Sequence, residues 1–215
     1  MYYSQHNQDR WLEENVFHGL KRGVFVDVGA HDGKTLNNTL FFEETHQWTG
    51  VNIEPIPFVF EQLEKNRPLG KNINVAIAEK EGDFPFLLND GYTEMLSGLQ
   101  EYFDERHKSR ISRENAHFKG NTTITNIPCR RLDNLLREHS ISRIHYLSVD
   151  VEGAEFSVIK SIDFEKTQID VIGFENNYND VSVPIILYLM EKGYKRLNYV
   201  GLDIMMIHKD SPLYH

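Results

Sequence analysis

Strand-like and helix-like patterns alternate along most of this chain, and this alternation constrains its fold more than any other sequence feature. Apolar runs with β-branched residues at 23–28, 49–53 and 72–78 predict three strands, and residues 35–45 and 57–66 between them predict helices. Strands that are joined through helices form a parallel sheet with right-handed crossovers. The first half of the chain therefore predicts an α/β fold with helices on both faces of a sheet.

The second half continues the alternation and then departs from it. Its expected helices and strands are residues 131–139, 144–149, 155–161, 169–174 and 183–192. Two further strand patterns, 194–200 and 203–208, are separated only by a turn at Gly201. Because so short a connection closes only a hairpin, the last strand is expected to run antiparallel to its neighbour.

An irregular stretch separates the two halves. Residues 82–88 predict an extra strand, and residues 89–122 are polar and rich in Tyr, His, Lys and Arg. A long insertion in a compact domain is usually functional or disordered. Its place after the third strand puts it near the carboxyl ends of the sheet, which favours a lid over a substrate; a surface loop is the alternative. We expect residues 1–215 to form one domain that carries this insertion.

Acidic residues end four of the expected strands: Asp27, Glu54, Asp150 and Glu175. In open parallel sheets, ligands bind outside these ends. Glu54 follows the second strand, ~20 residues beyond a glycine-bearing loop, where an acid accepts hydrogen bonds from both ribose hydroxyls of a nucleoside. The alternative for Glu54 is a cap on the following helix.

The loop after the first strand reads "FVDVGAHDG" and contains Gly29, His31 and Gly33. A strand that runs into such a turn and then a helix is a nucleotide-binding arrangement in many α/β proteins. His31 stands where the middle glycine of a dinucleotide fingerprint would be. Together with the expected antiparallel last strand, this disfavours a nucleotide-dependent oxidoreductase.

Several segments together resemble the FkbM family of S-adenosylmethionine-dependent methyltransferases. They occur in this order: "FVDVGAHDG", "GVNIEP", "NVAIAEKEGDFPF", "RRLDNLL" and "IHYLSVDVEGAEFSVIKSIDF". The opening "YSQHNQD" is also similar to the N-terminal segment of that family, and the resemblance fails mainly in residues 89–122. It implies O-methyl transfer, often to a sugar hydroxyl of a glycan or glycoside. It also implies a Rossmann-like class I methyltransferase sheet of seven mostly parallel strands with an antiparallel last strand.

The resemblance assigns the glycine-bearing loop to the methionine portion of S-adenosylmethionine. Asp27 would accept from the cofactor's amino group, directly or through loop amides, while Glu54 holds the ribose and Pro55 fixes the turn after it. His31 has two interpretations, a catalytic residue or a loop histidine that packs near the cofactor. The other residues expected to bind the cofactor are Gly29, Ala30, Gly33, Asp150 and, flanking the adenine, Ala76 and Ile77.

A sugar hydroxyl is a poor nucleophile until its proton is removed, and Asp150, Glu152 and His31 are the candidate bases. Glu152 has a second interpretation as a helix cap. Asp150 ends one parallel strand and Glu175, with Asn176, ends the next, about 4.8 Å away. Two carboxylates and an amide suit Mg²⁺ or Mn²⁺, so a metal site is predicted there. The alternative is that Glu175 and Asn176 hydrogen-bond the sugar directly.

Composition narrows the choice of partners and compartment. The net charge of −9 gives no support for nucleic acid as the main partner, and no apolar run approaches the roughly 20 residues of a membrane span. A lone cysteine, Cys129, and an N-terminus without the apolar core of a secretory signal predict a cytoplasmic protein. A carbohydrate is the expected acceptor. A phenolic or other small-molecule acceptor, or a non-catalytic member that binds the cofactor, are the alternatives.

Overall fold

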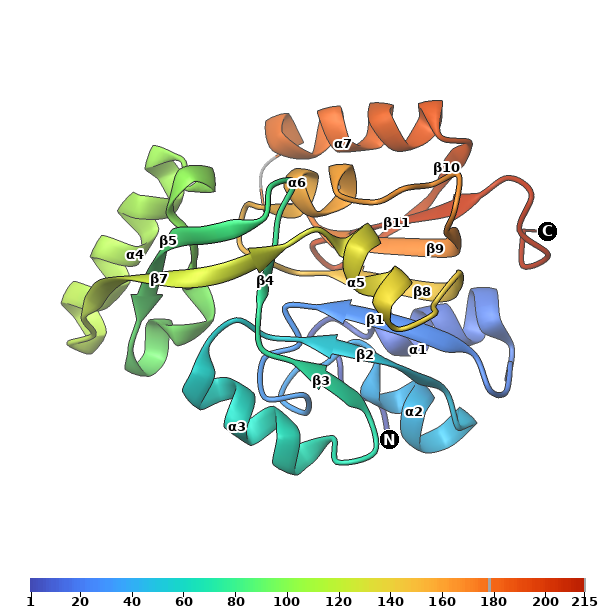
Figure 1. Cartoon of the computed structure of the whole chain (residues 1–215), viewed down its shortest axis with the longest axis horizontal. Helices are drawn as coiled ribbons and strands as arrows, with labels where there is room; N and C mark the ends of the chain where they lie inside the picture. The colour runs from blue at the N-terminus through green and yellow to red at the C-terminus, as the bar shows by residue number, and fades with distance from the viewer. Residues whose placement is uncertain (178, 215) are drawn as a thin grey trace.

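The main sheet of the chain contains seven strands in the order β10-β11-β9-β8-β1-β2-β3 (Figure 1). The structure is a computed structural model and describes residues 1–177 and 179–214. The strands are β1 (Val24–Val28), β2 (Thr49–Ile53), β3 (Lys71–Ile73), β8 (Arg143–Val149), β9 (Gln168–Glu175), β10 (Tyr194–Val200) and β11 (Asp203–His208). The pairs among β1, β2, β3, β8 and β9 are parallel, and β11 is antiparallel to both β9 and β10. The expected mostly parallel sheet with an antiparallel last strand is confirmed.

Helices cover both faces of this sheet, as predicted. They are α1 (Gln8–Leu12) with the π-helical η1 (Glu13–Phe17), α2 (Leu40–His46), α3 (Pro57–Asn66), α5 (Leu132–Glu138), α6 (Glu155–Lys160) and α7 (Asn179–Glu191). Alternation along β1 divides the core, because Val26 and Val28 pack on the α5, α6 and α7 side while Phe25 packs on the α1 and α2 side. None of the helices in residues 1–177 and 179–214 is long and apolar enough to cross a membrane.

A second sheet, in the order β4-β7-β5-β6, carries the insertion. Its strands are β4 (Ala76–Ile77), β5 (Gly82–Asn89), β6 (Gly98–Leu99) and β7 (Thr122–Arg130). β5 and β7 pair antiparallel along their length, and between them lie the 3-10 helices η2 (Gly91–Leu96) and η3 (Gln100–Tyr102) and the helix α4 (Glu105–Phe118). Figure 1 shows this unit beyond the arrowheads of β1 and β2, at the carboxyl ends of the main strands.

Two sequence-based elements differ from the structure. The single strand expected at 72–78 is divided into β3 and β4, because Asn74 Nδ2 donates to the carbonyl oxygens of Glu54 at 2.8 Å and Pro55 at 3.0 Å. β4 then leaves the main sheet and pairs with β7. The helix expected from residue 35 begins only at Leu40, since Asn37 Oδ1 accepts the Leu40 N–H at 2.8 Å and so caps the helix there.

Candidate functional site

A cavity of about 240 Å³ lies at the carboxyl ends of the main strands. Its wall is built by the loop after β1, the residues after β2, β8 and β9, the strand β4, part of the insertion and the N-terminal segment. β1 lies between β2 and β8, so Glu54 and the Asp150–Glu175 pair occupy different parts of this wall.

The glycine-bearing loop approaches the segment after β8 closely. Gly29 has a φ of +86°, and a Cβ there would lie 1.7 Å from the backbone oxygen of Asp150, so no side chain fits. The N–H groups of Gly29 and Ala30 both donate to the carbonyl oxygen of Ile53 at 3.0 Å. Gly33 lies elsewhere: a Cβ there would meet Leu63 at 2.4 Å, which places it against α3 and outside the described cavity wall.

Asp27 lies in β1 and is almost completely buried. Its Oδ2 accepts hydrogen bonds from Asn37 Nδ2 and Thr39 Oγ1, both at 2.9 Å. Burial raises the pKa of Asp27, while the nearby charge of Arg67 and the bonds from Thr39 and Asn37 act in the opposite direction. Asp27 therefore anchors the loop that follows Gly29, and its predicted contact with the cofactor's amino group would have to share this network.

Glu54 links the glycine-bearing loop to the start of α3. Its Oε2 accepts the His31 N–H at 3.0 Å and its Oε1 accepts the Ile56 N–H at 2.8 Å. Burial raises the pKa of Glu54 to about 7, although these two backbone donors lower it. Each carboxylate oxygen has a second lone pair, so Glu54 can hold the start of α3 and still accept hydrogen bonds from hydroxyls in the cavity. Its two interpretations from the sequence, ribose binding and helix capping, are therefore compatible.

His31 faces the insertion. Its φ of +51° puts it in the left-handed region, and its Nε2 lies 3.0 Å from Glu94 Oε1 in η2. Its backbone N–H is the one that Glu54 accepts. The structure thus places His31 with the residues expected to bind the cofactor, on the β2 side of the cavity.

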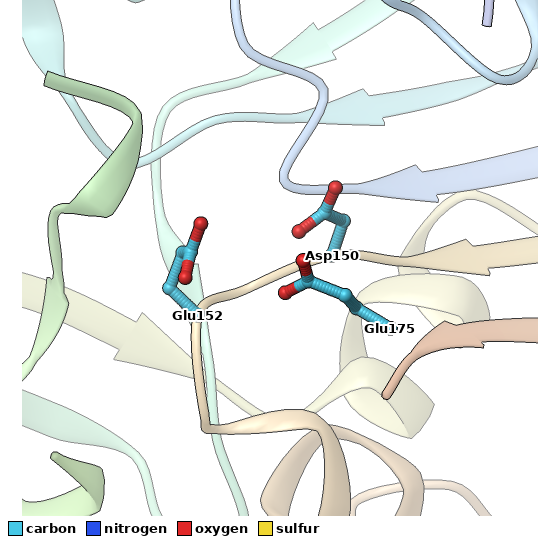
Figure 2. Close-up of side chains that lie close together, drawn as sticks. All are labelled: Asp150, Glu152 and Glu175. Atoms are coloured by element: carbon cyan, nitrogen blue, oxygen red, sulfur yellow. The ribbon is translucent and has the colours of Figure 1, made fainter. Parts of the chain in front are cut away.

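Three acidic side chains gather where β8 and β9 end. Ligand oxygens of Asp150, Glu152 and Glu175 all lie within 4.8 Å of one another, and Figure 2 shows the three carboxylates turned toward a common space. Burial and the neighbouring carboxylates raise the pKa of Asp150 well above its usual range and that of Glu175 to about 11. Burial also raises the pKa of Glu152 to about 8, although the charge of Arg110 opposes it.

The turn between β8 and α6 brings Glu152 into this group. Glu152 has a φ of +53° and Gly153 a φ of +111°, so the segment after β8 is a left-handed turn. Glu155 stabilises the turn, since its Oε1 accepts the N–H of Gly153 at 3.0 Å. The interpretation of Glu152 as a helix cap is wrong, because the N-cap residue of α6 is Ala154 and the bonded carboxylate is Glu155.

Asn176, the third predicted metal ligand, lies beside this cluster. It lines a smaller hollow beside the main cavity, together with Glu152, Glu175 and residues of α4 and α7. Its backbone N–H donates to the carbonyl oxygen of Leu202 at 2.9 Å. Glu152 is thus a further acid beside Asp150, Glu175 and Asn176, the set that the sequence predicted as metal ligands.

Comparison with known proteins agrees with this architecture. The sequence profile of the Methyltransferase FkbM domain matches residues 27–197, which is most of the chain. The chain belongs to the FkbM family of S-adenosylmethionine-dependent methyltransferases. A search of curated proteins found no significant match.

Solved methyltransferase structures share the fold. An FkbM methyltransferase from Methylobacillus flagellatus KT aligns with a TM-score of 0.54 at 13% identity, over 88% of this chain and 45% of that one. The METTL16 MTase domain aligns with a TM-score of 0.51 at 13% identity, over 94% and 65% of the two chains. The N-terminal domain of human METTL16 in complex with SAH gives 0.50 at 14%, over 94% and 67%. This FkbM chain thus spans about half to two thirds of these structures, and identities this low show the class I methyltransferase fold alone.

The cavity of this FkbM family member suits the cofactor of its class. Pro55, Ala76 and Ile77, which the sequence assigned to cofactor binding, line it together with the apolar Phe86. Among the buried polar atoms of the wall, His31 Nδ1 and Asn38 Oδ1 on the cofactor side have no hydrogen-bond partner within residues 1–177 and 179–214. Buried polar atoms normally have partners, so these two fit contact with a polar ligand.

Several wall residues were not predicted as site residues. Arg110 of α4 is a cation on the wall beside Glu152 and Glu175, and Glu94 of η2 bonds His31. At the N-terminus, Gln8 Nε2 donates to Asp203 Oδ2 at 3.1 Å and brings this segment to the cavity. The similarity of "YSQHNQD" to the family was the one signal for that segment. The further unpredicted polar wall residues are Gln5, His6, Thr35, Asn37, Asn38, Ser97 and Asn177.

Proposed function

We propose that this chain transfers a methyl group from S-adenosylmethionine to a hydroxyl of a carbohydrate acceptor. The observation that carries the proposal is the position of the Asp150–Glu152–Glu175 cluster in the same cavity as Glu54 and the glycine-bearing loop. A donor site on the β2 side and a cluster of acids on the β8 and β9 side would let the two substrates meet in one space. The family and its fold support the donor, and the acids support a hydroxyl acceptor.

S-adenosylmethionine, when bound, supplies a methyl group on an electrophilic sulfonium. The protein is left with two tasks, to align the acceptor oxygen and to receive its proton. Asp150 follows β8 directly and packs against Gly29 through its backbone, which places its carboxyl beside the loop assigned to the methionine portion. Glu152, with a pKa of about 8, has the proton affinity that suits a base near neutral pH. We assign proton acceptance to Asp150 and Glu152, and we assign His31 to the part of the cavity that binds the cofactor.

We further propose that Asp150, Glu152 and Glu175 hold a Mg²⁺ or Mn²⁺ ion. Their oxygens converge within one ion's reach, and Glu152 Oε2 is buried without a hydrogen-bond partner in the described part of the chain. Such an ion would relieve the repulsion among the acids and lower the pKa of a hydroxyl next to it. The competing role is direct hydrogen bonding to the sugar, which the raised pKa values favour, because a protonated carboxyl can both donate and accept.

The wall of the cavity favours a sugar over a phenol. An aromatic acceptor needs an apolar slot, whereas charged and polar side chains surround the acid cluster. These side chains are Arg110, Asn177 and Asp203. A phenolic acceptor and a non-catalytic, cofactor-binding role remain the alternatives that the experiment must separate.

The test is a methyl-transfer assay over a panel of glycosides and phenols, with S-adenosylmethionine as donor and mass detection of the products. We expect at least one glycoside to gain the mass of one methyl group, and Asp150→Asn to abolish that product. Methylation of catechol or simple phenols without any methylated glycoside would overturn the carbohydrate assignment. Cofactor binding by calorimetry, with no product from any acceptor, would instead indicate the non-catalytic role.

A further inference from the structure

Two aromatic rings are stacked in the open on the insertion. Tyr92 of η2 and Phe118 at the end of α4 have ring centroids 3.8 Å apart and an interplanar angle of 27°. Tyr92 is 69% exposed and Phe118 is 43% exposed. Large aromatic surface left in water often marks a binding surface, and here it lies on the segment interpreted as a lid.

Hydrogen bonds join the segments that carry the two rings, η2 and α4. The buried Thr93, next to Tyr92, donates through Oγ1 to Asn115 Oδ1 of α4, and Asn115 Nδ2 donates to Thr122 Oγ1 at 2.9 Å. Gly120 allows this close approach, because a Cβ there would lie 2.6 Å from Asn115 Oδ1. η2, α4 and β7 are thus joined by hydrogen bonds from residues close in sequence to Tyr92 and Phe118.

The aromatic surface continues to the mouth of the cavity. Side chains three residues apart are eclipsed in a 3-10 helix, so Met95 lies on the same face of η2 as Tyr92. Met95 is 41% exposed and lines the cavity, as do its neighbours Glu94 and Leu96. One face of η2 therefore leads from the cavity wall to the stacked rings.

We propose that Tyr92 and Phe118 bind a sugar ring of a glycan acceptor, beyond the residue that is methylated. This inference rests on the proposed function and extends it from a glycoside to an oligosaccharide. The C–H face of a sugar packs on an aromatic ring while its hydroxyls stay in water, which matches half-exposed rings with a polar surround. A stable protein partner would need an interface of about 800 Å² on each side, far more than two rings and a methionine provide.

Binding is tested directly with Tyr92→Trp, which keeps a ring at this position and adds a fluorophore. The probes are maltotetraose, cellotetraose, mannotetraose and chitotetraose, added to the whole chain. We expect at least one to change the fluorescence of Tyr92→Trp in a saturable way, and the change to disappear in Tyr92→Trp with Phe118→Ala. Phe58→Trp is the matched control, because Phe58 is an exposed aromatic residue on α3, outside this surface. No saturable response to any of the four tetrasaccharides would overturn the inference.

Kinetics supply the second test. For a glycoside that is methylated, kcat/KM should increase with the number of sugar residues. Tyr92→Ala should lower the value for the tetrasaccharide roughly three- to tenfold while leaving the monosaccharide value unchanged. Tyr92→Phe should retain the preference for length, since only the ring is needed. Equal values for short and long acceptors in the unmodified chain would also overturn the inference.

The two hypotheses fail in different ways. Saturable tetrasaccharide binding without methyl transfer to any glycan would remove the proposed function and leave the sugar-binding surface standing. Methyl transfer to a monosaccharide, with neither a fluorescence response nor length dependence, would remove the surface and leave the proposed function standing.

Discussion

The two acidic regions of the cavity differ in how their carboxylates are supported. Glu54, on the β2 side, accepts one backbone N–H on each oxygen. Burial raises its pKa to about 7, and these two donors oppose that rise. In the cluster on the β8 and β9 side, Glu152 Oε2 is buried without a hydrogen-bond partner in residues 1–177 and 179–214. Glu175, next to it, has a pKa of about 11.

This contrast indicates different roles for the two acidic regions. Backbone donors hold the Glu54 carboxyl in place, and its anion, which predominates above a pH of about 7, suits the recognition of neutral hydroxyls of a bound nucleoside. The cluster instead concentrates negative charge that needs a proton, a cation or a substrate to offset it. We therefore expect changes at Glu54 to affect affinity for the cofactor, and changes in the cluster to affect turnover.

The largest expected effect is at Asp150. Asp150→Asn removes a charge and a proton acceptor with little change in shape, so turnover should fall by roughly 10²–10⁴-fold. Cofactor affinity, measured by calorimetry, should stay nearly unchanged. Glu101→Gln, at an exposed acid of η3, serves as the control for the loss of one negative charge. Turnover equal to that of the unmodified chain would remove Asp150 from the chemistry.

Glu54→Ala should produce the converse result. Loss of a charge-assisted contact with the ribose costs about 2 kcal/mol, so cofactor affinity should fall roughly thirtyfold. The variant also loses the acceptor for the His31 and Ile56 N–H groups, so its melting temperature should be recorded alongside calorimetry. Unchanged affinity in a folded variant would refute the ribose assignment.

Removal of metal tests whether the acid cluster holds an ion. If an ion holds the acceptor, EDTA should lower kcat by at least roughly tenfold, and added Mg²⁺ or Mn²⁺ should restore it. Glu175→Gln, which retains one ligand oxygen but loses the charge, should weaken the metal's effect in the same assay. Full activity after chelation, with no loss in Glu175→Gln, would exclude the ion and leave direct contact with the sugar.

The smallest effect concerns pH. With a pKa of about 7, the Glu54 carboxylate is largely protonated at pH 6, so cofactor affinity should fall roughly eightfold from pH 7.5 to 6. The free energy of unfolding should change in the opposite direction. The raised pKa of Glu54 contributes stability that is complete below the usual pKa of 4.5 and is lost as pH rises through about 7. Calorimetry across this range should show the affinity change in the unmodified chain and a flat profile in Glu54→Gln. The same slope in both would assign the titration to another group.

Local sequence pattern was sufficient to predict most strands of the main sheet. The sequence predicted β2, α3, β10 and β11 at the bounds that the structure has, because strand and helix periodicity and the short turn at Gly201 are local signals. It did not predict β7, whose exposed Thr122–Arg130 run is stabilised by pairing with β5 across the whole insertion. The split between β3 and β4 likewise depends on Asn74, which bonds carbonyls far away in the chain.

For the site, the sequence determined which acids stand at the carboxyl ends of parallel strands, and this alone predicted that Asp150 and Glu175 would be neighbours. The tertiary structure decided the rest. It added Glu152 through a left-handed turn, put Arg110 and Glu94 of the insertion on the cavity wall, and turned Gly33 toward α3. Strand ends follow from short-range pattern, whereas the order of the strands, the direction of a side chain in a turn and the docking of an insertion depend on contacts between residues distant in sequence.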